Sequence, residues 1–478
     1  MVNSKNKDDI EKTKTDYLDD SSIPLWRKRR YHVVAMILLG YLNLYAQRFN
    51  LSMAIVEMTK ITNVTLEDGT TIEEPAFDWD SKQQGFILSS FFYGYMATQL
   101  IGGYLASRFG GNLVFGIGIA ISSIAALLIP VLAKTHLALL FTARVIQGLS
   151  GGVVPPSVFV IWSKWAPVYE RSRMGNIGYT GTYVGIIASM LLSGVLSVAF
   201  GWESIFYFFG AIGCIWYVAW LFVVRSCPEE DSFITEVEKK YIMTSLGDKG
   251  QSDIIVHPWK DIFTSTAVWA VVVGSFTAMW GSYTLLTQLP MYLSDTMNFN
   301  MDTTGYLSAI PYLALVGLLF IAGYLADWVQ IKGYLRTGQV RRFWNCGAFI
   351  TQMAFMLLTA FATDPVLSMV FITLAVGAGA FPWSGYVVNA LDLAPSHSSI
   401  IFGLANTIAS IPGMLSPVVM GYIVTDKTRE QWRFVFYITA GVYLCGAVFC
   451  WFFVRGTLQP WAKIDQEKQK DKNRNDSE

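Results

Sequence analysis

The sequence predicts an all-α integral membrane protein with twelve transmembrane helices, arranged as two parallel six-helix halves. Composition is the first reason: 53% of the 478 residues are hydrophobic and 15% are charged, whereas a soluble chain carries about 25% charged residues. The second is a series of apolar windows of about 20 residues, the length that crosses a bilayer core. The third is an internal repeat, which is typical of transporters built from two related halves.

The apolar windows give the expected helices, with edges accurate to about two to four residues. The windows lie near 33–56, 83–106, 113–132, 137–161, 175–199, 203–225, 266–293, 303–326, 343–362, 366–390, 400–424 and 432–454.

Short motifs recur between the first six windows and the last six. Gly85 is followed by Gly103-Tyr-Leu-Ala106, and Gly305 by Gly323-Tyr-Leu-Ala326, an offset of 220 residues in both cases. Two more pairs recur at an offset of 230 residues: Trp202 with Trp432, and Phe222 with Phe452. Because six is even, both halves begin on the same side of the membrane and run parallel.

A polar stretch between the sixth and seventh windows divides the chain. Within it, Thr235-Glu-Val-Glu238 is a capping box that predicts the start of a short helix. The expected parts are a cytosolic tail 1–32, an N-terminal half 33–225, a cytosolic linker 226–265, a C-terminal half 266–454 and a cytosolic tail 455–478.

Lysine and arginine placement predicts the orientation, because cytoplasmic loops carry an excess of both. The basic clusters are Arg27-Lys-Arg-Arg30, Lys164 with Arg171 and Arg173, and Lys332 with Arg336, Arg341 and Arg342. They put both termini in the cytosol, although Lys427, Arg429 and Arg433 run against the trend. Asn63-Val-Thr65, a glycosylation acceptor, then lies in the first outer loop. The membrane is either the plasma membrane or a lysosomal or vesicular one.

Arg48 is the only charged residue between Val33 and Val56. A guanidinium near the middle of a membrane helix costs roughly 2.5–3.5 kcal/mol on insertion scales. Arg48 lies about eight residues, roughly 12 Å, from the outer end of its helix, which is a long way to snorkel to the interface. We therefore expect Arg48 in a polar cavity that binds a ligand; a structural pairing is the alternative.

Arg144 is the second charge deep in the bilayer, about seven residues or roughly 10 Å below the outer surface. Arg48 reaches nearly the same depth from the opposite direction, and no Asp or Glu lies deep in any window. Two cations at one level favour a shared anion, because guanidinium captures carboxylate or phosphate with paired hydrogen bonds. The alternative is that Arg144 braces helix carbonyls.

Tyrosines add hydrogen-bonding candidates for the same ligand. Tyr45 lies one turn before Arg48, and Tyr283 lies well inside the seventh window, where an interfacial anchor is not expected. The substrate-binding set is thus Arg48, Arg144, Tyr283 and Tyr45, with further polar lining from Asn50, Gln288, Asn389 and Asn406.

The sequence gives no support for enzyme activity. It contains no phosphate loop, no His/Cys set with metal spacing and no nucleophile constellation. We expect no cofactor and no metal, a proton or a sodium ion as the coupling ion, membrane lipid and a small anion as partners, no nucleic acid, and a monomer.

These residues resemble the anion:cation symporter branch of the major facilitator superfamily, which contains sialin, the vesicular glutamate and nucleotide transporters and the type I sodium–phosphate cotransporters. The resemblance runs from the first helix to just past the twelfth. It rests on Tyr45-x-x-Arg48-x-Asn50-Leu-Ser, Ser90-Phe-Phe-Tyr-Gly-Tyr95 through Gly102-Gly-Tyr-Leu-Ala-Ser-Arg108, Trp162-Ser-Lys-Trp-Ala-Pro167 through Glu170-Arg-Ser-Arg173, Asn389-Ala-Leu-Asp392-Leu-Ala-Pro395, Arg429-Glu-Gln-Trp432 and Gln459-Pro-Trp-Ala462. It implies an alternating-access fold and anion binding by Arg48 and Arg144, with Tyr283 nearby.

The chain departs from the family pattern at three positions. Proton-coupled members typically have an acidic residue on the fourth helix, where Gly151 stands here. The glutamate branch has a His on the second helix and an Arg on the seventh, where the chain has Leu88 and Ala278. The resemblance therefore points to the sialin-like and phosphate-cotransporter-like members.

The predicted function is secondary active transport of small organic or inorganic anions by alternating access. Sodium-driven phosphate symport and membrane-potential-driven anion uniport are alternatives of the same class, and Gly151 makes the second more plausible. A non-transporting membrane sensor or scaffold is the alternative of another class, and it would tolerate neutralisation of Arg48 and Arg144.

Overall fold

The computed structural model describes residues 24–65, 71–167, 170–246, 258–297, 299–394 and 397–462. Most of the predicted tails, 1–23 and 463–478, lies outside the described residues, as does part of the linker, 247–257. The boundaries of the two predicted halves and of the linker stay predictions.

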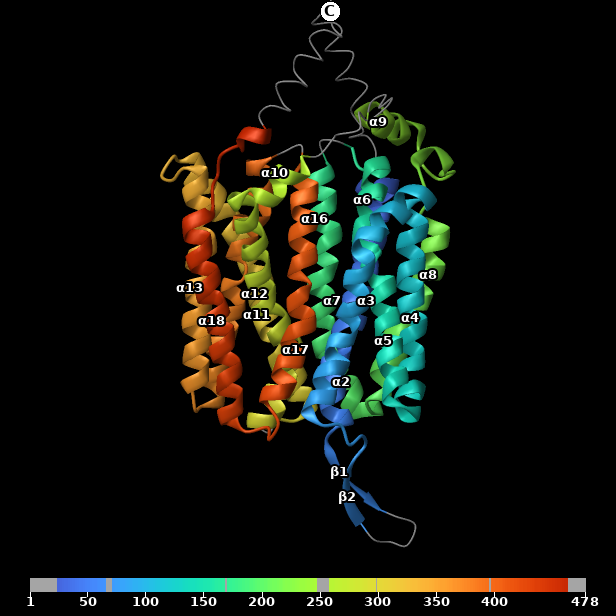
Figure 1. Cartoon of the computed structure of the whole chain (residues 1–478). Helices are drawn as coiled ribbons and strands as arrows, with labels where there is room; N and C mark the ends of the chain where they lie inside the picture. The colour runs from blue at the N-terminus through green and yellow to red at the C-terminus, as the bar shows by residue number, and fades with distance from the viewer. Residues whose placement is uncertain are drawn as a thin grey trace, which may run out of the picture. The chain divides into compact units, whose positions relative to one another are not determined.

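The first part of the chain is helical apart from one hairpin (Figure 1). Its helices are η1 (Leu25–Arg27), α2 (Arg29–Met58), α3 (Ser81–Phe109), α4 (Gly111–Thr135), α5 (Leu137–Gly152), α6 (Val154–Trp165), α7 (Arg171–Phe200) and α8 (Glu203–Val223).

Three short helices follow, and then the second set of long helices (Figure 1). The elements are η2 (Pro228–Glu230), α9 (Glu236–Leu246), α10 (Trp259–Thr264), α11 (Thr266–Met297), α12 (Met301–Ile331), α13 (Thr337–Phe361), α14 (Pro365–Ala378), the π-helix η3 (Trp383–Val387), α15 (Val388–Leu393), α16 (Ser398–Ala409), α17 (Ile411–Ile423) and α18 (Arg429–Phe453).

The prediction of twelve membrane-crossing helices is confirmed. Among the described residues, 10 helical segments are long and apolar enough to cross a membrane. The other two are α2 and α3, with 30 and 29 residues. Both are long enough to span, but buried polar residues such as Arg48 and Gln99 lower their hydropathy.

Three predicted helices are each interrupted once or more. The fourth consists of α5 and α6, which meet at Val153, two residues before Pro155 and three before Pro156. The tenth contains α14, η3 and α15, and the eleventh contains α16 and α17. A proline has no N–H to donate and its ring clashes with the preceding turn, so these breaks follow from the sequence.

A two-stranded hairpin connects α2 and α3, where the sequence predicted only an outer loop. Strands β1 (Ile61–Thr65) and β2 (Thr71–Pro75) pair antiparallel, with Asn63 opposite Glu73. β1 is rich in Ile, Val and Thr, and β2 begins with Thr71 and Ile72; these residue types favour extended structure. Asn63 therefore lies in a strand, and its glycosylation stays a prediction.

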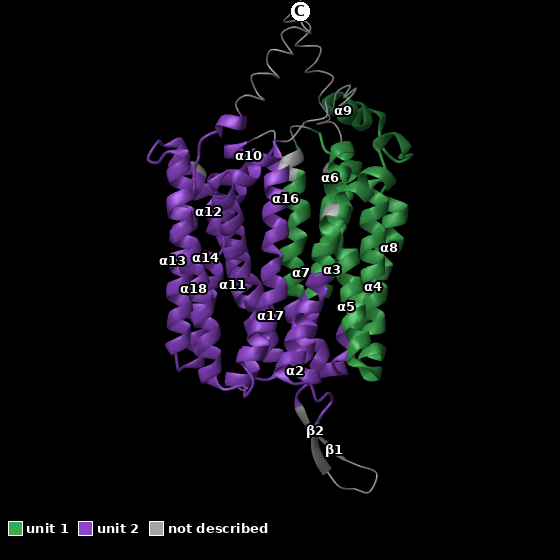
Figure 2. Ribbon diagram, in the orientation of Figure 1, with its two compact units in different colours: residues 1–48, 94–188, 206–254 green, residues 49–93, 189–205, 255–478 purple. Residues whose placement is uncertain are grey.

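The chain forms two compact units, which Figure 2 shows in different colours. Unit 1 contains residues 1–48, 94–188 and 206–254, and unit 2 contains residues 49–93, 189–205 and 255–478. In unit 1, Phe115, Trp216 and Trp220 pack edge to face or tilted in one apolar cluster with residues of α2. In unit 2, α13 lies along α18, and α11 packs on α16, α17 and α18.

The basic residues that oppose the charge rule have a structural role in unit 2. Arg433 donates from Nε to the carbonyl oxygen of Ala360 at 3.1 Å, and Arg429 donates to the carbonyl oxygen of Ala362. These carbonyls belong to the C-terminal end of α13, where no further turn can satisfy them. A positive charge there also interacts favourably with the helix dipole.

The short helix α9 anchors the start of α2 within unit 1. The backbone N–H of Glu238 donates to Thr235 Oγ1 at 3.3 Å, which is half of the predicted capping box. The carboxylate of Glu238 instead accepts from the backbone N–H groups of Arg29 and Arg30, at 2.8 and 3.1 Å. One acidic side chain of the linker therefore caps the first membrane helix.

Candidate functional site

Arg144 of α5 is 1% exposed and holds the backbone of α2. Its Nη1 donates to the carbonyl oxygen of Gln47 at 3.0 Å, and its Nη2 donates to that of Arg48 at 2.8 Å. The same Nη1 donates to Oε1 of Gln147, one turn further along α5, at 2.8 Å. The two arginines thus lie at the same depth, as expected, and Arg144 makes the carbonyl-bracing contacts that the sequence left open.

A chain of uncharged polar groups supports this contact in unit 1. Gln147 Nε2 donates to the carbonyl oxygen of Ser122 on α4 at 3.0 Å. Ser122 Oγ donates to Gln47 Oε1 at 2.8 Å, and Gln47 Nε2 donates to Ser123 Oγ at 2.9 Å. Because each of these groups is buried, their hydrogen bonds fix α2, α4 and α5 in one arrangement.

The guanidinium of Arg48 is 3% exposed and lies beside two tyrosine rings. Its Cζ is 4.4 Å from the ring centroid of Tyr95 on α3 and 5.5 Å from that of Tyr45 on α2. A cation over an aromatic face is stabilised by about 0.5–2 kcal/mol, more when it is desolvated. The two rings hold the group in place.

A cavity of about 400 Å³ in unit 1 begins on the same face of α2. Ile37 and Tyr41 line it, and a helix of 3.6 residues per turn puts positions 37, 41, 45 and 48 on one face. The ring of Tyr41 is 6.3 Å from that of Tyr45 and 5.4 Å from that of Tyr179. The remaining lining residues are Val158, Phe159, Trp162, Ser163, Gly175, Asn176 and Tyr179.

The other predicted site residues belong to unit 2. Asn50 follows Arg48 by two residues, about 200° around the helix, so it does not share the face of Arg48. It is fully buried, and neither of its amide atoms has a hydrogen-bond partner among the described residues. The ring of Tyr283 on α11 packs edge to face on Phe92 at 4.8 Å.

The remaining polar candidates of unit 2 have separate surroundings. Gln288 lines a small cavity with Asp295 and Trp432. Asn389 donates from Nδ2 to the carbonyl oxygen of Arg455 at 2.8 Å, so it holds the chain after α18. Asn406 is half-buried in α16. The structure therefore gathers Tyr45, Arg48 and Arg144, and a common lining formed by the four amides stays a prediction.

Two residues of the site were missed by sequence reasoning. Tyr95 contacts Arg48, and Gln147 supports Arg144. The sequence did contain a signal for Gln147: it lies three residues after Arg144 on one helix, and side chains at this spacing interact. Tyr95 had none, because only the packing of α3 on α2 brings it to Arg48.

Comparison with known proteins identifies the family to which this chain is similar. The model described as Major Facilitator Superfamily matches residues 37–417 and 331–475. The chain is 38% identical over 447 residues to vesicular glutamate transporter 2 of Bos taurus, covering 92% of this chain and 76% of that protein. It is 37% identical over 459 residues to sialin of Homo sapiens, covering 92% of each. These similar identities do not separate the two branches.

Solved structures show the same fold. A bacterial homologue of the human lysosomal transporter Spinster has a TM-score of 0.71 at 13% identity, covering 90% of this chain and 99% of that one. The D-xylose–proton symporter has a TM-score of 0.65 at 14% identity, covering 89% and 98%.

Proposed function

Because the chain belongs to the major facilitator superfamily, and within it to the family of sialin and the vesicular glutamate transporters, we propose that it carries small organic or inorganic anions across the membrane. It is a multi-pass membrane protein with a secondary-transporter fold, and its relatives are transporters, not enzymes. Alternating access moves the substrate between the two sides.

One observation carries the anion proposal: Arg48 is a buried cation that lies against two aromatic rings and whose backbone carbonyl oxygen is held by a second buried arginine. Keeping a guanidinium inside the bilayer costs roughly 2.5–3.5 kcal/mol on insertion scales. A carboxylate or phosphate bound to it in paired hydrogen bonds would offset that cost. Arg48 is therefore the proposed substrate ligand, with Tyr45 beside it.

Arg144 has a different role in this proposal. Its donors are directed at the carbonyl oxygens of Gln47 and Arg48, so it positions the helix that carries the substrate arginine. Its charge adds to the positive potential that attracts an anion. Tyr283 of α11 is proposed as a hydrogen-bond donor to the substrate. Two grounds support this role: its position well inside the helix and the resemblance to the family.

The driving force is proposed separately. Gly151 stands where proton-coupled members of the family have an acidic residue, which favours uptake driven by the membrane potential. The alternative is symport, with a proton or a sodium ion as the coupling ion. Relatives named vesicular transporters favour an intracellular membrane over the plasma membrane.

The test is uptake into vesicles that contain the purified protein. Radiolabelled phosphate, sialic acid and glutamate are each offered under a sodium gradient, a proton gradient or a membrane potential alone. Wild type is compared with Arg48→Ala and with Arg27→Ala, a matched change at an exposed arginine. We expect uptake of at least one anion, loss of uptake in Arg48→Ala, and normal uptake in Arg27→Ala.

The outcomes separate the alternatives. Uptake of phosphate that needs a sodium gradient identifies the phosphate symporter, and uptake under a potential alone identifies the uniporter. Absence of uptake for every anion, or uptake that is indifferent to Arg48→Ala, contradicts the proposal and favours the sensor or scaffold.

A further inference from the structure

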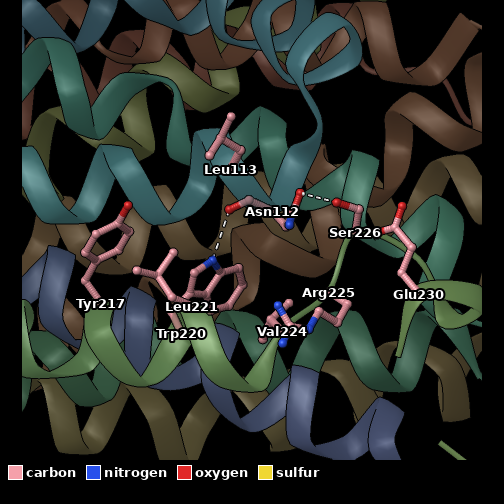
Figure 3. Close-up of a pocket in the computed structure, with 9 residues that line it drawn as sticks. All are labelled: Asn112, Leu113, Tyr217, Trp220, Leu221, Val224, Arg225, Ser226 and Glu230. Carbon is pink, nitrogen blue, oxygen red and sulfur yellow. Dashed lines mark hydrogen bonds between the residues drawn. The ribbon is translucent and has the colours of Figure 1, made fainter. Parts of the chain in front are cut away.

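A second cavity in unit 1 lies where α4 begins and α8 ends, and Arg48 is not among its lining residues. Figure 3 shows the residues that line it. Its volume is about 180 Å³. Typical sites for drug-sized ligands have about 300–1,000 Å³, and a water molecule takes about 30 Å³, so the cavity has room for a small polar group. Its lining residues are Asn112, Leu113, Tyr217, Trp220, Leu221, Val224, Arg225, Ser226 and Glu230.

Hydrogen bonds shape one wall of this cavity. Trp220 Nε1 donates to the carbonyl oxygen of Asn112 at 3.0 Å, and Ser226 Oγ donates to Asn112 Oδ1 at 3.2 Å (Figure 3). Asn112 is in the first turn of α4, a 25-residue helix whose free N–H groups and dipole favour an anion at this end. The wall is thus preformed, and the first-turn N–H groups of α4 are the donors that its helix start offers to a ligand.

Two opposite charges border the cavity. The side chains of Arg225 and Glu230 are both exposed. In the part of the chain that the structure describes, neither takes part in an ion pair, whereas Arg29, Arg30 and Arg341 do. A ligand with an anionic and a cationic group would complement both.

The depth of the cavity points to the membrane surface. The membrane span of α8 ends at Val223, two residues before Arg225, and α4 begins its span at Gly111. Next to the cavity, Leu113, Leu221 and Phe222 are 45%, 46% and 70% exposed. In a membrane protein such exposed apolar side chains face lipid chains, so the polar rim lies at the level of the headgroups.

We propose that this cavity binds the headgroup of an aminophospholipid such as phosphatidylethanolamine. The phosphate is bound by Arg225, with Ser226 and the first turn of α4 beside it, and the ammonium is bound by Glu230. The acyl chains run along Leu113 and Leu221. A free dianion such as inorganic phosphate is disfavoured by the carboxylate of Glu230.

Native mass spectrometry of the purified protein tests the proposal. The protein is offered phosphatidylethanolamine, phosphatidylcholine and phosphatidylglycerol with identical acyl chains, and the retained lipid is counted. We expect about tenfold stronger retention of phosphatidylethanolamine than of phosphatidylcholine, because methylation removes the N–H donors to Glu230. Phosphatidylglycerol has no ammonium group and should also be retained more weakly.

Substitutions of Arg225 and Glu230 test the role proposed for each of the two charged side chains. Arg225→Gln should lower retention of all three lipids and Arg225→Lys should partly restore it, while Glu230→Gln should abolish only the preference for phosphatidylethanolamine over phosphatidylcholine. Lys332→Gln, at an exposed cation of unit 2, is the matched control and should change nothing.

Equal retention of the three lipids by wild type, a preference that survives Glu230→Gln, or retention that Arg225→Gln leaves unchanged overturns the proposal. Preferential retention of phosphatidylglycerol overturns it as well, since an anionic lipid would then be the ligand. Circular dichroism of each variant shows that it is folded. The measurement does not involve transport, so its result is independent of the proposed substrate site.

Discussion

The guanidinium of Arg144 donates through Nη2 to the backbone carbonyl oxygen of Arg48 over 2.8 Å. A helix carbonyl has two lone pairs, so it can accept this bond in addition to one inside the helix. The contact joins α5 to α2 at the residue that we propose binds the substrate. Two guanidinium groups are thereby held at one level of the membrane, an arrangement that an anion stabilises.

We expect Arg144→Lys to lower both stability and transport. An ammonium is a compact charge and cannot reproduce the planar fork that reaches two carbonyl oxygens and Gln147 at once. Each hydrogen bond to a charged group is worth about 1.5–3 kcal/mol, so losing one or two should lower the melting temperature clearly. Thermal unfolding in detergent measures the first effect and vesicle uptake the second.

Gln147→Leu is the companion variant, because it removes only one partner of Arg144. Its loss of stability should be smaller than that of Arg144→Lys. If Arg144→Lys had the same melting temperature as wild type, the two carbonyl contacts would contribute nothing to stability.

Substitutions at Tyr95 should separate its ring from its hydroxyl group. The ring centroid lies 4.4 Å from the guanidinium carbon of Arg48. Tyr95→Phe keeps the aromatic face and should keep KM near that of wild type. Tyr95→Leu removes about 0.5–2 kcal/mol of cation–π interaction, which corresponds to a rise in KM of roughly 2–30-fold if the ring holds Arg48 ready for substrate. Equal KM values for the two variants would contradict this role.

The membrane helices could be predicted because each is one long apolar window, and Arg48 and Arg144 because a charge in such a window is conspicuous. The sequence could not show which residues far apart in the chain contact each other. The capping box gave Glu238 a local role, yet its carboxylate caps Arg29 and Arg30. Likewise, nothing local to Tyr95 indicates that it meets Arg48.

The hairpin between α2 and α3 was missed for a related reason. Each strand has only 5 residues. Two strands this short give too little alternation of apolar and polar residues to predict their pairing. The bond from Asn389 to the carbonyl oxygen of Arg455 is likewise a contact between distant parts of the chain that the sequence does not indicate.

Gly194 should be intolerant of a larger side chain. A Cβ atom there would lie 2.8 Å from the carbonyl oxygen of Met301 and 3.2 Å from Cα of Gly305, so α7 and α12 touch backbone to backbone within unit 2. Close approach through small residues is how membrane helices associate. Gly194→Val should separate the two helices and abolish uptake.

Gly317→Ala on α12 is the control for that experiment, because a Cβ atom there meets nothing within 4 Å. Alanine is favoured over glycine in a helix by about 1 kcal/mol, so this variant should be as stable as wild type or more so. Normal uptake by Gly194→Val, measured beside Gly317→Ala, would show that the contact of α7 with α12 is dispensable.

Glu170 should make the stability of the folded protein depend on pH in the acidic range. Burial acts to raise the pKa of its carboxyl, but hydrogen bonds and charge from Arg30, with hydrogen bonds from Tyr241 and Tyr31, outweigh burial and hold the pKa below its usual value. The distances from Arg30 Nε and Nη2 to the carboxylate are 3.0 and 3.1 Å. Since the carboxylate form is favoured by folding, its contribution is present above the unfolded pKa of about 4.3 and is lost as pH falls from there through the lowered folded pKa.

The measurement compares melting temperatures of wild type and Glu170→Gln between pH 7 and pH 3. Wild type should be more stable at pH 7. The difference should shrink as pH falls below about 4.3, because the unfolded chain of wild type then binds a proton at Glu170, and it is lost once the folded protein is protonated there as well. Glu229→Gln, at an exposed acid, should show no comparable difference at pH 7. A stability gap between wild type and Glu170→Gln that stays constant down to pH 3 would mean that the side chain acts through its shape and not through its charge.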